Sequence, residues 1–266
     1  MRPQRIYTTE VVVLRVRRMG EADSVLTLLS ADRGKFDAVA RGVRKPTSRK
    51  AGHIEPLMQS TLLLAHGTNL DIITQAHALH TFLPMREDLR RLGGGLYAAE
   101  LVDRFTVERE ESFSIYRLLV ETLGHLSEGE HVDLTLRYFE ARLLQEAGFR
   151  PQLYQCVTCG EALQPVTNYF SVAGGGAVCP TCRPAGSGLP PIGVTLLKVL
   201  RLMLRSGYAD VARLRLGETL MSDLESLLRL AVHRQLEREP RSLQFLRELR
   251  RPYLAGAIPP AATPVP

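Results

Sequence analysis

The sequence predicts an α+β multidomain protein: an N-terminal five-stranded OB-fold β-barrel, then an α-helical domain interrupted by a small four-cysteine module. Three observations lead to this fold class. Short β-branched runs separated by turn residues fill roughly the first third of the 266 residues. Apolar residues then recur at helical spacing. All four cysteines lie in two C-x-x-C pairs in the second half of the chain.

The pattern changes also suggest where the domains begin and end. We place the barrel at residues 1–80, the helical domain at 81–150 and 190–250, the cysteine module at 151–189, and a disordered tail at 255–266. The tail is rich in proline and alanine and has no apolar period.

Five strands are expected between residues 6 and 76. They are β-branched or alternate apolar with polar residues, and turn sequences such as Ala31-Asp32-Arg33-Gly34 separate them. The expected strands are residues 11–17, 24–30, 35–40, 57–65 and 70–75. Five short strands in about seventy residues are typical of the OB-fold, a Greek-key barrel, although an SH3-like barrel fits nearly as well.

Helical periodicity starts after Pro84 and returns after the cysteine module. Helices are expected near residues 89–105, 114–127, 132–147, 194–206, 218–237 and 242–250. Gly93-Gly94-Gly95 interrupts the first of these and indicates either a close helix contact or a kink. Because neither set of helices has an obvious core of its own, we expect both sets to pack into one bundle.

The cysteine spacing predicts a metal site. Cys156 and Cys159 form one C-x-x-C pair, Cys179 and Cys182 form the other, and nineteen residues separate the pairs. Each short turn can present two sulfurs to one tetrahedral ion, and residues 168–172 between them are strand-like, as in a zinc-ribbon-like module with four cysteine ligands.

Two other interpretations of the cysteines compete with zinc. Disulfides are disfavoured because no signal peptide is recognised and a chain of this length does not need such links. A redox C-x-x-C usually occurs once, beside a βαβ unit. We expect one structural Zn²⁺ whose four thiolates leave no open position, and therefore no catalysis at the metal.

Composition suggests a soluble cytoplasmic protein. Hydrophobic residues make up 45% and charged residues 23%, which is ordinary for a globular chain. The longest apolar runs are far too short to cross a bilayer, and no targeting segment is recognised. Reduced thiols, no membrane span and no signal together favour the cytoplasm.

The positive charge is concentrated at the N-terminus. Residues 1–50 contain twelve Lys or Arg and five Asp or Glu, a net +7, so the rest of the chain sums to −1. Residues 41–50 contain five cations and no acid. An isolated run of this kind is usually a solvated loop, but between barrel strands it favours phosphate binding. The predicted nucleic-acid-binding residues are Arg15, Arg17, Lys35, Arg41, Arg44, Lys45, Arg49 and Lys50.

Aromatic side chains for base stacking are scarce. Only 6% of residues are aromatic and none is tryptophan. Tyr7 and Phe36 are the aromatics before Phe82, and the alternation around Phe36 favours a core position. We therefore expect binding through the phosphate backbone with little sequence preference.

Catalytic patterns are absent or weak. Neither glycine run is followed by Lys-Ser/Thr, and the sequence contains no G-x-S-x-G or H-E-x-x-H. His53 lies near Glu55 and His77 near His80, but nothing else converges on them, so we interpret them as structural or solvated. The expectation is a protein that is not an enzyme, has no catalytic residues and binds no small-molecule substrate.

The chain resembles the bacterial RecO family over residues 5–240. The resemblance lies in GFRPQLYQCVTCG at 148–160, Phe170-Ser171, the glycine run and VCPTC at 178–182. EADS at 21–24, Gly34-Lys35, RGVRK at 41–45 and Ser48-Arg49 in the barrel add to it. Family members without the four cysteines exist, which fits a scaffold role for zinc.

The resemblance implies a recombination mediator in DNA repair. Such a protein binds single- and double-stranded DNA without sequence specificity and anneals complementary strands. With RecR it promotes RecA loading on single-stranded gaps, and it engages the single-stranded-DNA-binding protein. It would be associated with the bacterial nucleoid.

Two alternatives belong to other functional classes. One is a zinc-ribbon adaptor that works mainly through protein partners, with incidental contact to nucleic acid, including RNA. The other is a zinc-dependent enzyme that modifies nucleic acid, which the lack of a Glu or His beside the cysteine pairs disfavours.

Overall fold

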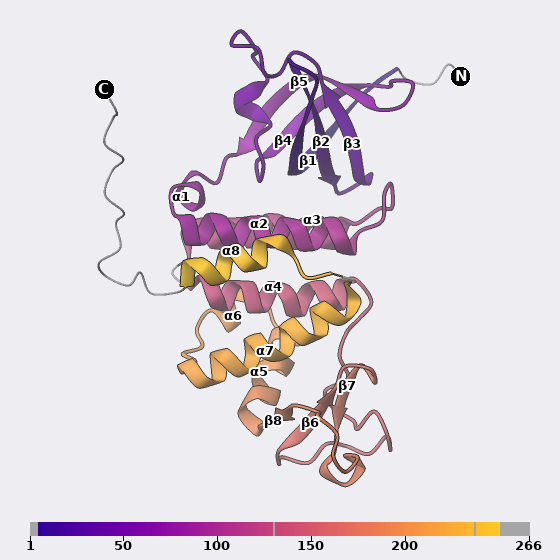
Figure 1. Cartoon of the computed structure of the whole chain (residues 1–266), viewed down its shortest axis with the longest axis vertical. Helices are drawn as coiled ribbons and strands as arrows, with labels where there is room; N and C mark the ends of the chain where they lie inside the picture. The colour runs from indigo at the N-terminus through magenta and orange to yellow at the C-terminus, as the bar shows by residue number, and fades with distance from the viewer. Residues whose placement is uncertain (1–4, 130, 237, 251–266) are drawn as a thin grey trace, which may run out of the picture.

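The computed structural model describes residues 5–129, 131–236 and 238–250. The β-barrel lies at one end of the long axis, the helical bundle in the middle and a small sheet at the other end (Figure 1). The tail predicted at residues 255–266 lies outside the described residues. Among the described helices, none has the length and apolar character needed to cross a membrane.

The barrel is closed and has five strands: β1 (Ile6–Met19), β2 (Asp23–Ser30), β3 (Gly34–Ala40), β4 (Gln59–Ala65) and β5 (Asp71–His80). The strand order is β1-β2-β3-β5-β4, with β4 returning to β1; of these neighbouring pairs, β3 and β5 run parallel and the others antiparallel. This order confirms the OB-fold over the SH3-like alternative.

Strand β1 pairs with two neighbouring strands. It pairs with β4 through Val12 and with β2 from Val11 onward, and its register shifts between Val13 and Arg15. Such an irregularity bends a strand, which lets one long strand close the barrel. Beyond Val12 one edge of β1 is free of β4. Both β1 and β5 extend beyond the predicted strands, and several apolar side chains in these extensions are exposed, including Ile6, Met19 and Leu79.

Within the described residues the helical bundle contains six longer helices and two single turns. They are α1 (Leu83–Arg86), α2 (Leu89–Phe105), α3 (Phe113–Glu128), α4 (Val132–Glu146), α5 (Val194–Arg205), α6 (Tyr208–Val211), α7 (Glu218–Gln235) and α8 (Arg241–Arg250). The six longer helices match the prediction; α1 and α6 were not predicted. One continuous apolar core includes side chains from helices on both sides of the cysteine module.

Helix α2 continues without interruption through its three glycines, and their surroundings confirm the close-contact interpretation. A Cβ added at Gly95 would lie 2.9 Å from both Leu57 and Met85, and one at Gly93 would lie 3.0 Å from Leu246. The glycines therefore let the barrel's connecting segment, α1 and α8 approach the helix closely.

The cysteine module contains a three-stranded sheet of β6 (Asn168–Ser171), β7 (Gly176–Val178) and β8 (Pro191–Ile192), in the order β7-β6-β8. The predicted strand at residues 168–172 is confirmed. Phe170 and Ile192 are buried and belong to the same apolar core as the helices. The module is thus packed against the bundle rather than tethered to it.

The barrel and the bundle are joined by backbone contacts as well as side chains. After α2 the chain runs beside β3, where the Arg109 N–H donates to the Lys35 carbonyl at 2.7 Å. Gly34 has φ +62°, and a Cβ there would lie 1.8 Å from the Glu110 carbonyl oxygen. Only glycine fits this position, so the junction is tightly packed.

Candidate nucleic-acid interface and metal centre

The loop after β3, residues 41–50, will be called the basic loop. Its backbone is held at several points: the Gly42 N–H donates to Asp23 at 2.7 Å, and the Arg44 N–H donates to the Ala22 carbonyl at 2.9 Å. Gly42 has φ +63°, a left-handed conformation that glycine adopts without strain. The basic loop therefore has a defined path against the β1–β2 turn.

The five cations of the basic loop make no ion pair with a carboxylate among the described residues. Arg41, Arg44, Lys45 and Arg49 are exposed. The Arg44 guanidinium donates to the Gly20 carbonyl at 3.2 Å, and the Lys50 ammonium donates to the Ile73 carbonyl at 2.9 Å. Carbonyl oxygens orient these cations without neutralising them, so their charge remains available to an external anion.

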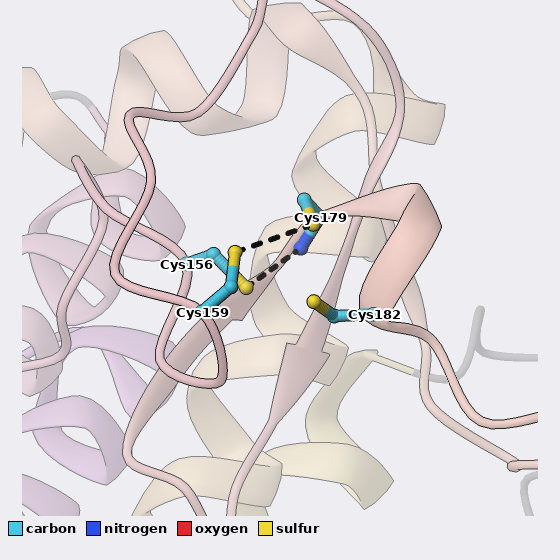
Figure 2. Close-up of side chains that lie close together, drawn as sticks. All are labelled: Cys156, Cys159, Cys179 and Cys182. Atoms are coloured by element: carbon cyan, nitrogen blue, oxygen red, sulfur yellow. Dashed lines mark hydrogen bonds between the residues drawn. The ribbon is translucent and has the colours of Figure 1, made fainter.

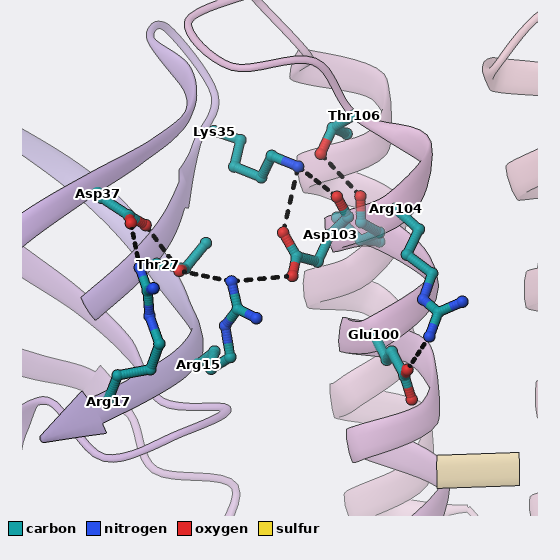
Figure 3. A network of polar contacts seen from close by, with 10 residues as sticks. Arg15, Arg17, Thr27, Lys35, Asp37, Glu100, Asp103, Arg104 and Thr106 are labelled. Carbon is teal, nitrogen blue, oxygen red and sulfur yellow. Dashed lines mark hydrogen bonds and ion pairs between the residues drawn. The ribbon is translucent and has the colours of Figure 1, made fainter. Parts of the chain in front are cut away.

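The other three predicted cations form a network with carboxylates, which we call the charge ladder (Figure 3). It consists of Arg17, Asp37, Thr27, Arg15, Asp103 and Lys35. The Arg17 guanidinium pairs with Asp37, which accepts a hydrogen bond from Thr27 at 2.7 Å. Arg15 lies 3.4 Å from the Thr27 hydroxyl and 3.5 Å from the Asp103 carboxylate.

Lys35 closes the charge ladder against the bundle. Its ammonium lies 3.1 Å from the Asp103 carboxylate and also donates to the Asp103 carbonyl, and its side chain is only 13% exposed. Arg15 and Arg17 are about half exposed, whereas Asp37 and Asp103 are mostly covered. Three cations and two acids leave the charge ladder with a net charge of +1.

The eight predicted binding residues thus fall into two sets. The basic loop contains five cations that pair with no acid in the part of the chain that the structure describes, and the charge ladder contains three cations that do pair with acids. Sequence reasoning missed Asp37 and Asp103 as partners. Asp37 follows Phe36 in the alternation of β3, so its outward orientation was visible in the sequence; Asp103 lies 68 residues from Lys35, and no local pattern joins them.

The barrel aromatics do not form an open stacking surface. Phe36 is buried, as predicted. Tyr7 donates to Asp71 at 2.5 Å, and the Arg33 guanidinium covers its ring at 3.8 Å. Burial and the neighbouring Asp71 carboxylate raise the pKa of Tyr7 well above its ordinary value. The Tyr7 hydroxyl is therefore a structural donor.

The histidines singled out in the sequence also have local partners. His53 accepts a hydrogen bond from the Ala78 N–H at 3.3 Å, and its ring stacks on His77 at 6.0 Å between centroids. His80 lies against Phe82. Glu55 is paired with Arg86 rather than with a histidine. Each of these side chains therefore has a neighbour in the barrel or at its junction with the bundle.

The four cysteines converge on one point (Figure 2). Their sulfur atoms all lie within 4.8 Å of one another, and the Sγ atoms of Cys159 and Cys179 are 4.0 Å apart without a disulfide bond. Cys156 is buried, and its sulfur accepts the Cys179 N–H at 3.3 Å. Gly160, with φ +77°, turns the chain beside the first pair.

Sulfur chemistry and geometry at this site both fit a tetrahedral metal ion. Zinc–sulfur bonds of about 2.3 Å place tetrahedral sulfurs about 3.8 Å apart, close to the observed spacing. Burial raises the pKa of the Cys156 thiol, but backbone N–H donors, that of Cys179 first, lower it to about 6. The neighbouring sulfurs, that of Cys159 first, raise the pKa of the Cys182 thiol to about 12. Four thiolates at this distance need a cation to share them. The described residues contain no other group of this kind.

Two family models match the chain in succession. "Recombination protein O N terminal" matches residues 1–82, and "Recombination protein O C terminal" matches residues 86–244. The boundary between them falls at α1, where the barrel ends and the bundle begins.

Curated relatives over most of the chain are named DNA repair protein RecO. One from Roseiflexus sp. (strain RS-1) is 43% identical over 246 residues, which cover 92% of this chain and 87% of the relative. One from Desulforudis audaxviator (strain MP104C) is 38% identical over 244 residues, or 91% and 97% of the two chains. One from Dehalococcoides mccartyi (strain CBDB1) is 36% identical over 244 residues, or 92% and 96%.

Proposed function

The chain belongs to the recombination protein O (RecO) family, and on this premise we propose that it is a non-enzymatic mediator of recombinational DNA repair in the bacterial cytoplasm. In this proposal it binds single- and double-stranded DNA without sequence specificity and anneals complementary strands. With RecR it promotes loading of RecA on strands covered by the single-stranded-DNA-binding protein.

The observation that carries the DNA-binding part is the set of unpaired cations in the basic loop. Arg41, Arg44, Lys45 and Arg49 are exposed on a loop whose backbone is fixed, and they make no ion pair with an acid of the described chain. A fixed row of uncompensated cations suits a polyanion, because phosphates release condensed counterions when such a surface binds.

Annealing requires no bond-breaking chemistry. Two complementary strands repel each other through their phosphates, and a cationic surface that neutralises part of this charge lowers the barrier to pairing. This supports a role without catalytic residues, and the site that we propose consists of contacts to phosphate oxygens.

The metal in this proposal is one structural Zn²⁺ held by Cys156, Cys159, Cys179 and Cys182. Four sulfur ligands and the two C-x-x-C turns favour zinc among the divalent metals of proteins. Because the four thiolates fill a tetrahedral shell, the ion would organise the fold of the module and leave no position for a reactive water.

The experiment that tests the DNA-binding site replaces all five cations of the basic loop by alanine. We expect weaker binding of a labelled oligonucleotide, and a slope of log affinity against log salt that is shallower by about 0.7 for each phosphate that the variant no longer binds. Fluorescence anisotropy over a salt series measures both. A second assay follows annealing of complementary oligonucleotides by energy transfer.

The matched control removes the same charge from exposed side chains of the bundle. They are Lys198, Arg205, Arg213, Arg229 and Arg234. If the control variant and the basic-loop variant lose affinity equally, binding follows net charge and the proposed site is wrong. If the parent protein itself does not bind DNA, and its complexes with partner proteins survive nuclease treatment, the adaptor alternative replaces the mediator.

A further inference from the structure

A groove lies beside the basic loop, on the face of β1 opposite the charge ladder. Val16 alternates with Arg15 and Arg17 along the strand, so its side chain points the other way. At this point β1 has no β4 partner, and the edge is lined instead by the segment around Ile54. The groove has a volume of about 480 Å³, within the range of roughly 300–1,000 Å³ for small-ligand pockets.

The floor of this groove is apolar and its rim is cationic. Val16, Val43 and Ile54 form the floor, Pro46 lines it, and Arg44 and Lys45 stand at the rim. Val16 is 37% exposed, whereas Val43 and Ile54 are nearly buried. Glu55 also lines the groove, but its carboxylate is paired with Arg86.

The Arg44 guanidinium is positioned in advance. Its backbone N–H donates to the Ala22 carbonyl and its side chain donates to the Gly20 carbonyl, both in the β1–β2 turn. A guanidinium plane fixed at the rim of an apolar groove can stack on one face of a flat, uncharged ring. The floor would then contact the other face.

We propose that this groove holds one unstacked nucleobase of a single DNA strand, with the flanking phosphates on the basic loop. The inference rests on the proposed function and adds a contact to the base, which binding through phosphates alone does not include. The apolar floor favours a ring over a phosphate, and the cationic rim favours the charged backbone that carries the ring. A paired base inside a duplex cannot enter without being unstacked, so the groove selects single strands.

The test compares two probes that carry the same phosphates. One is an oligothymidylate of about 16 nucleotides, the upper end of the OB-fold site size. The other has the same length and an abasic site at every position. Because stacking of one base contributes about 1–3 kcal/mol, we expect the intact full chain to bind the base-carrying probe at least about fivefold more tightly.

Two variants locate that preference. Arg44→Lys keeps the charge but removes the guanidinium plane, and Val16→Ser removes part of the floor at a half-exposed position. We expect the affinity ratio between the two probes to fall to about one in Arg44→Lys and to decrease in Val16→Ser. Arg41→Lys is the matched control, because Arg41 does not line the groove; its ratio should match that of the parent.

The outcomes separate this inference from the proposed function. If the parent binds both probes equally and with the expected salt dependence, the DNA-binding function stands and the base groove is wrong. If Arg41→Lys lowers the ratio as much as Arg44→Lys does, the base contact lies elsewhere. If neither probe binds in a salt-dependent manner, the proposed function itself fails.

Discussion

The cysteine cluster and the basic loop lie in different parts of the molecule, but each gathers several groups of one kind in a small space. Four sulfur atoms lie within 4.8 Å of one another at one site, and five cations lie within ten residues at the other. Neither group has an opposite charge paired with it among the described residues. Each group favours a ligand from outside the chain: a metal ion that binds the four sulfurs as thiolates, and a polyanion that binds the cations.

In the charge ladder, by contrast, the cations are paired with acids of the protein itself. Its three cations are as prominent in the sequence as those of the basic loop, but Asp37 and Asp103 neutralise most of their charge. A cation paired inside the protein stabilises the fold, whereas a cation without such a partner is free to bind a ligand. Counting lysines and arginines cannot separate these two roles; the positions of the carboxylates can.

Of the changes that test this comparison, removal of the metal from the cysteine cluster should have the largest effect. Structural zinc contributes about 10–16 kcal/mol in zinc-finger peptides, and this module shares its core with the bundle through Phe170 and Ile192. We expect chelation, or Cys156→Ser, to expose the amides of β6 and β7 to hydrogen exchange while the barrel amides stay protected. Hydrogen exchange measured by mass spectrometry distinguishes the two regions.

Metal analysis of the same samples gives the control. The untreated protein should carry one zinc per chain, and returning zinc after chelation should restore protection. Unchanged exchange in β6 and β7 after complete removal of the metal would contradict a structural role.

Lys35 and Lys45 provide the next test. Lys35 is paired with an acid and Lys45, within the described part of the chain, is not, so replacement by alanine should mainly affect stability at Lys35 and DNA binding at Lys45. Lys35→Ala leaves the mostly covered Asp103 with only the more distant Arg15, so we expect a loss of about 1–3 kcal/mol in the free energy of unfolding. Lys45 is exposed, so Lys45→Ala should change stability by less than about 0.5 kcal/mol. Urea denaturation measures both.

DNA affinity should follow the reverse order. Lys45→Ala should weaken oligonucleotide binding and reduce its salt dependence, whereas Lys35→Ala should do so only slightly at temperatures where it is folded. Both residues belong to the DNA-binding set predicted from the sequence. If Lys35→Ala weakens binding as much as Lys45→Ala without loss of stability, that prediction holds for Lys35 and the structural role assigned to it is wrong.

The contrast between these two lysines also explains what the sequence could predict. The four-cysteine cluster could be predicted because each C-x-x-C turn is local, and the barrel could be predicted because strand alternation is local. The single-turn helices α1 and α6 span four residues each, too few to show a helical period. The ion pair of Lys35 with Asp103 joins two domains and the groove at Val16 joins three segments, and both exist only after folding.

Replacing Asp37 should leave a cation of the charge ladder without its acid partner, as the cations of the basic loop are among the described residues. Asp37→Asn removes the ion partner of Arg17 but keeps an oxygen that can accept from Thr27. Arg17 is about half exposed, so we expect DNA to bind about two- to fivefold more tightly, with a slightly steeper salt dependence. Glu10→Gln is the matched control, because it removes one negative charge from an exposed position on β1. Equal gains in both variants would indicate a general charge effect and not release of Arg17.

Glu100 is a carboxylate whose described partners all come from the chain, and it tests the same contrast inside the bundle. It accepts hydrogen bonds from the Arg241 N–H at 3.0 Å and the Ser242 N–H at 2.8 Å, at the start of α8, and it pairs with Arg104 at 2.6 Å. Burial raises the pKa of Glu100, but the hydrogen bonds from Ser242 and Arg241 outweigh it, so the pKa lies below its ordinary value.

The direction of the pH dependence follows from this lowered pKa. The ionised form is favoured in the folded protein, so the stabilisation is complete above the ordinary glutamate pKa of about 4.3 and is lost as the pH falls below it. We expect the protection of α8 against hydrogen exchange to decrease over that range. Glu100→Gln should lower stability near neutral pH by about 1 kcal/mol and weaken this pH dependence, whereas Glu111→Gln, at an exposed position, should do neither. If Glu100→Gln keeps the full pH dependence of α8, another carboxylate controls the helix, and the contrast between internally paired and externally paired charges does not extend to the bundle.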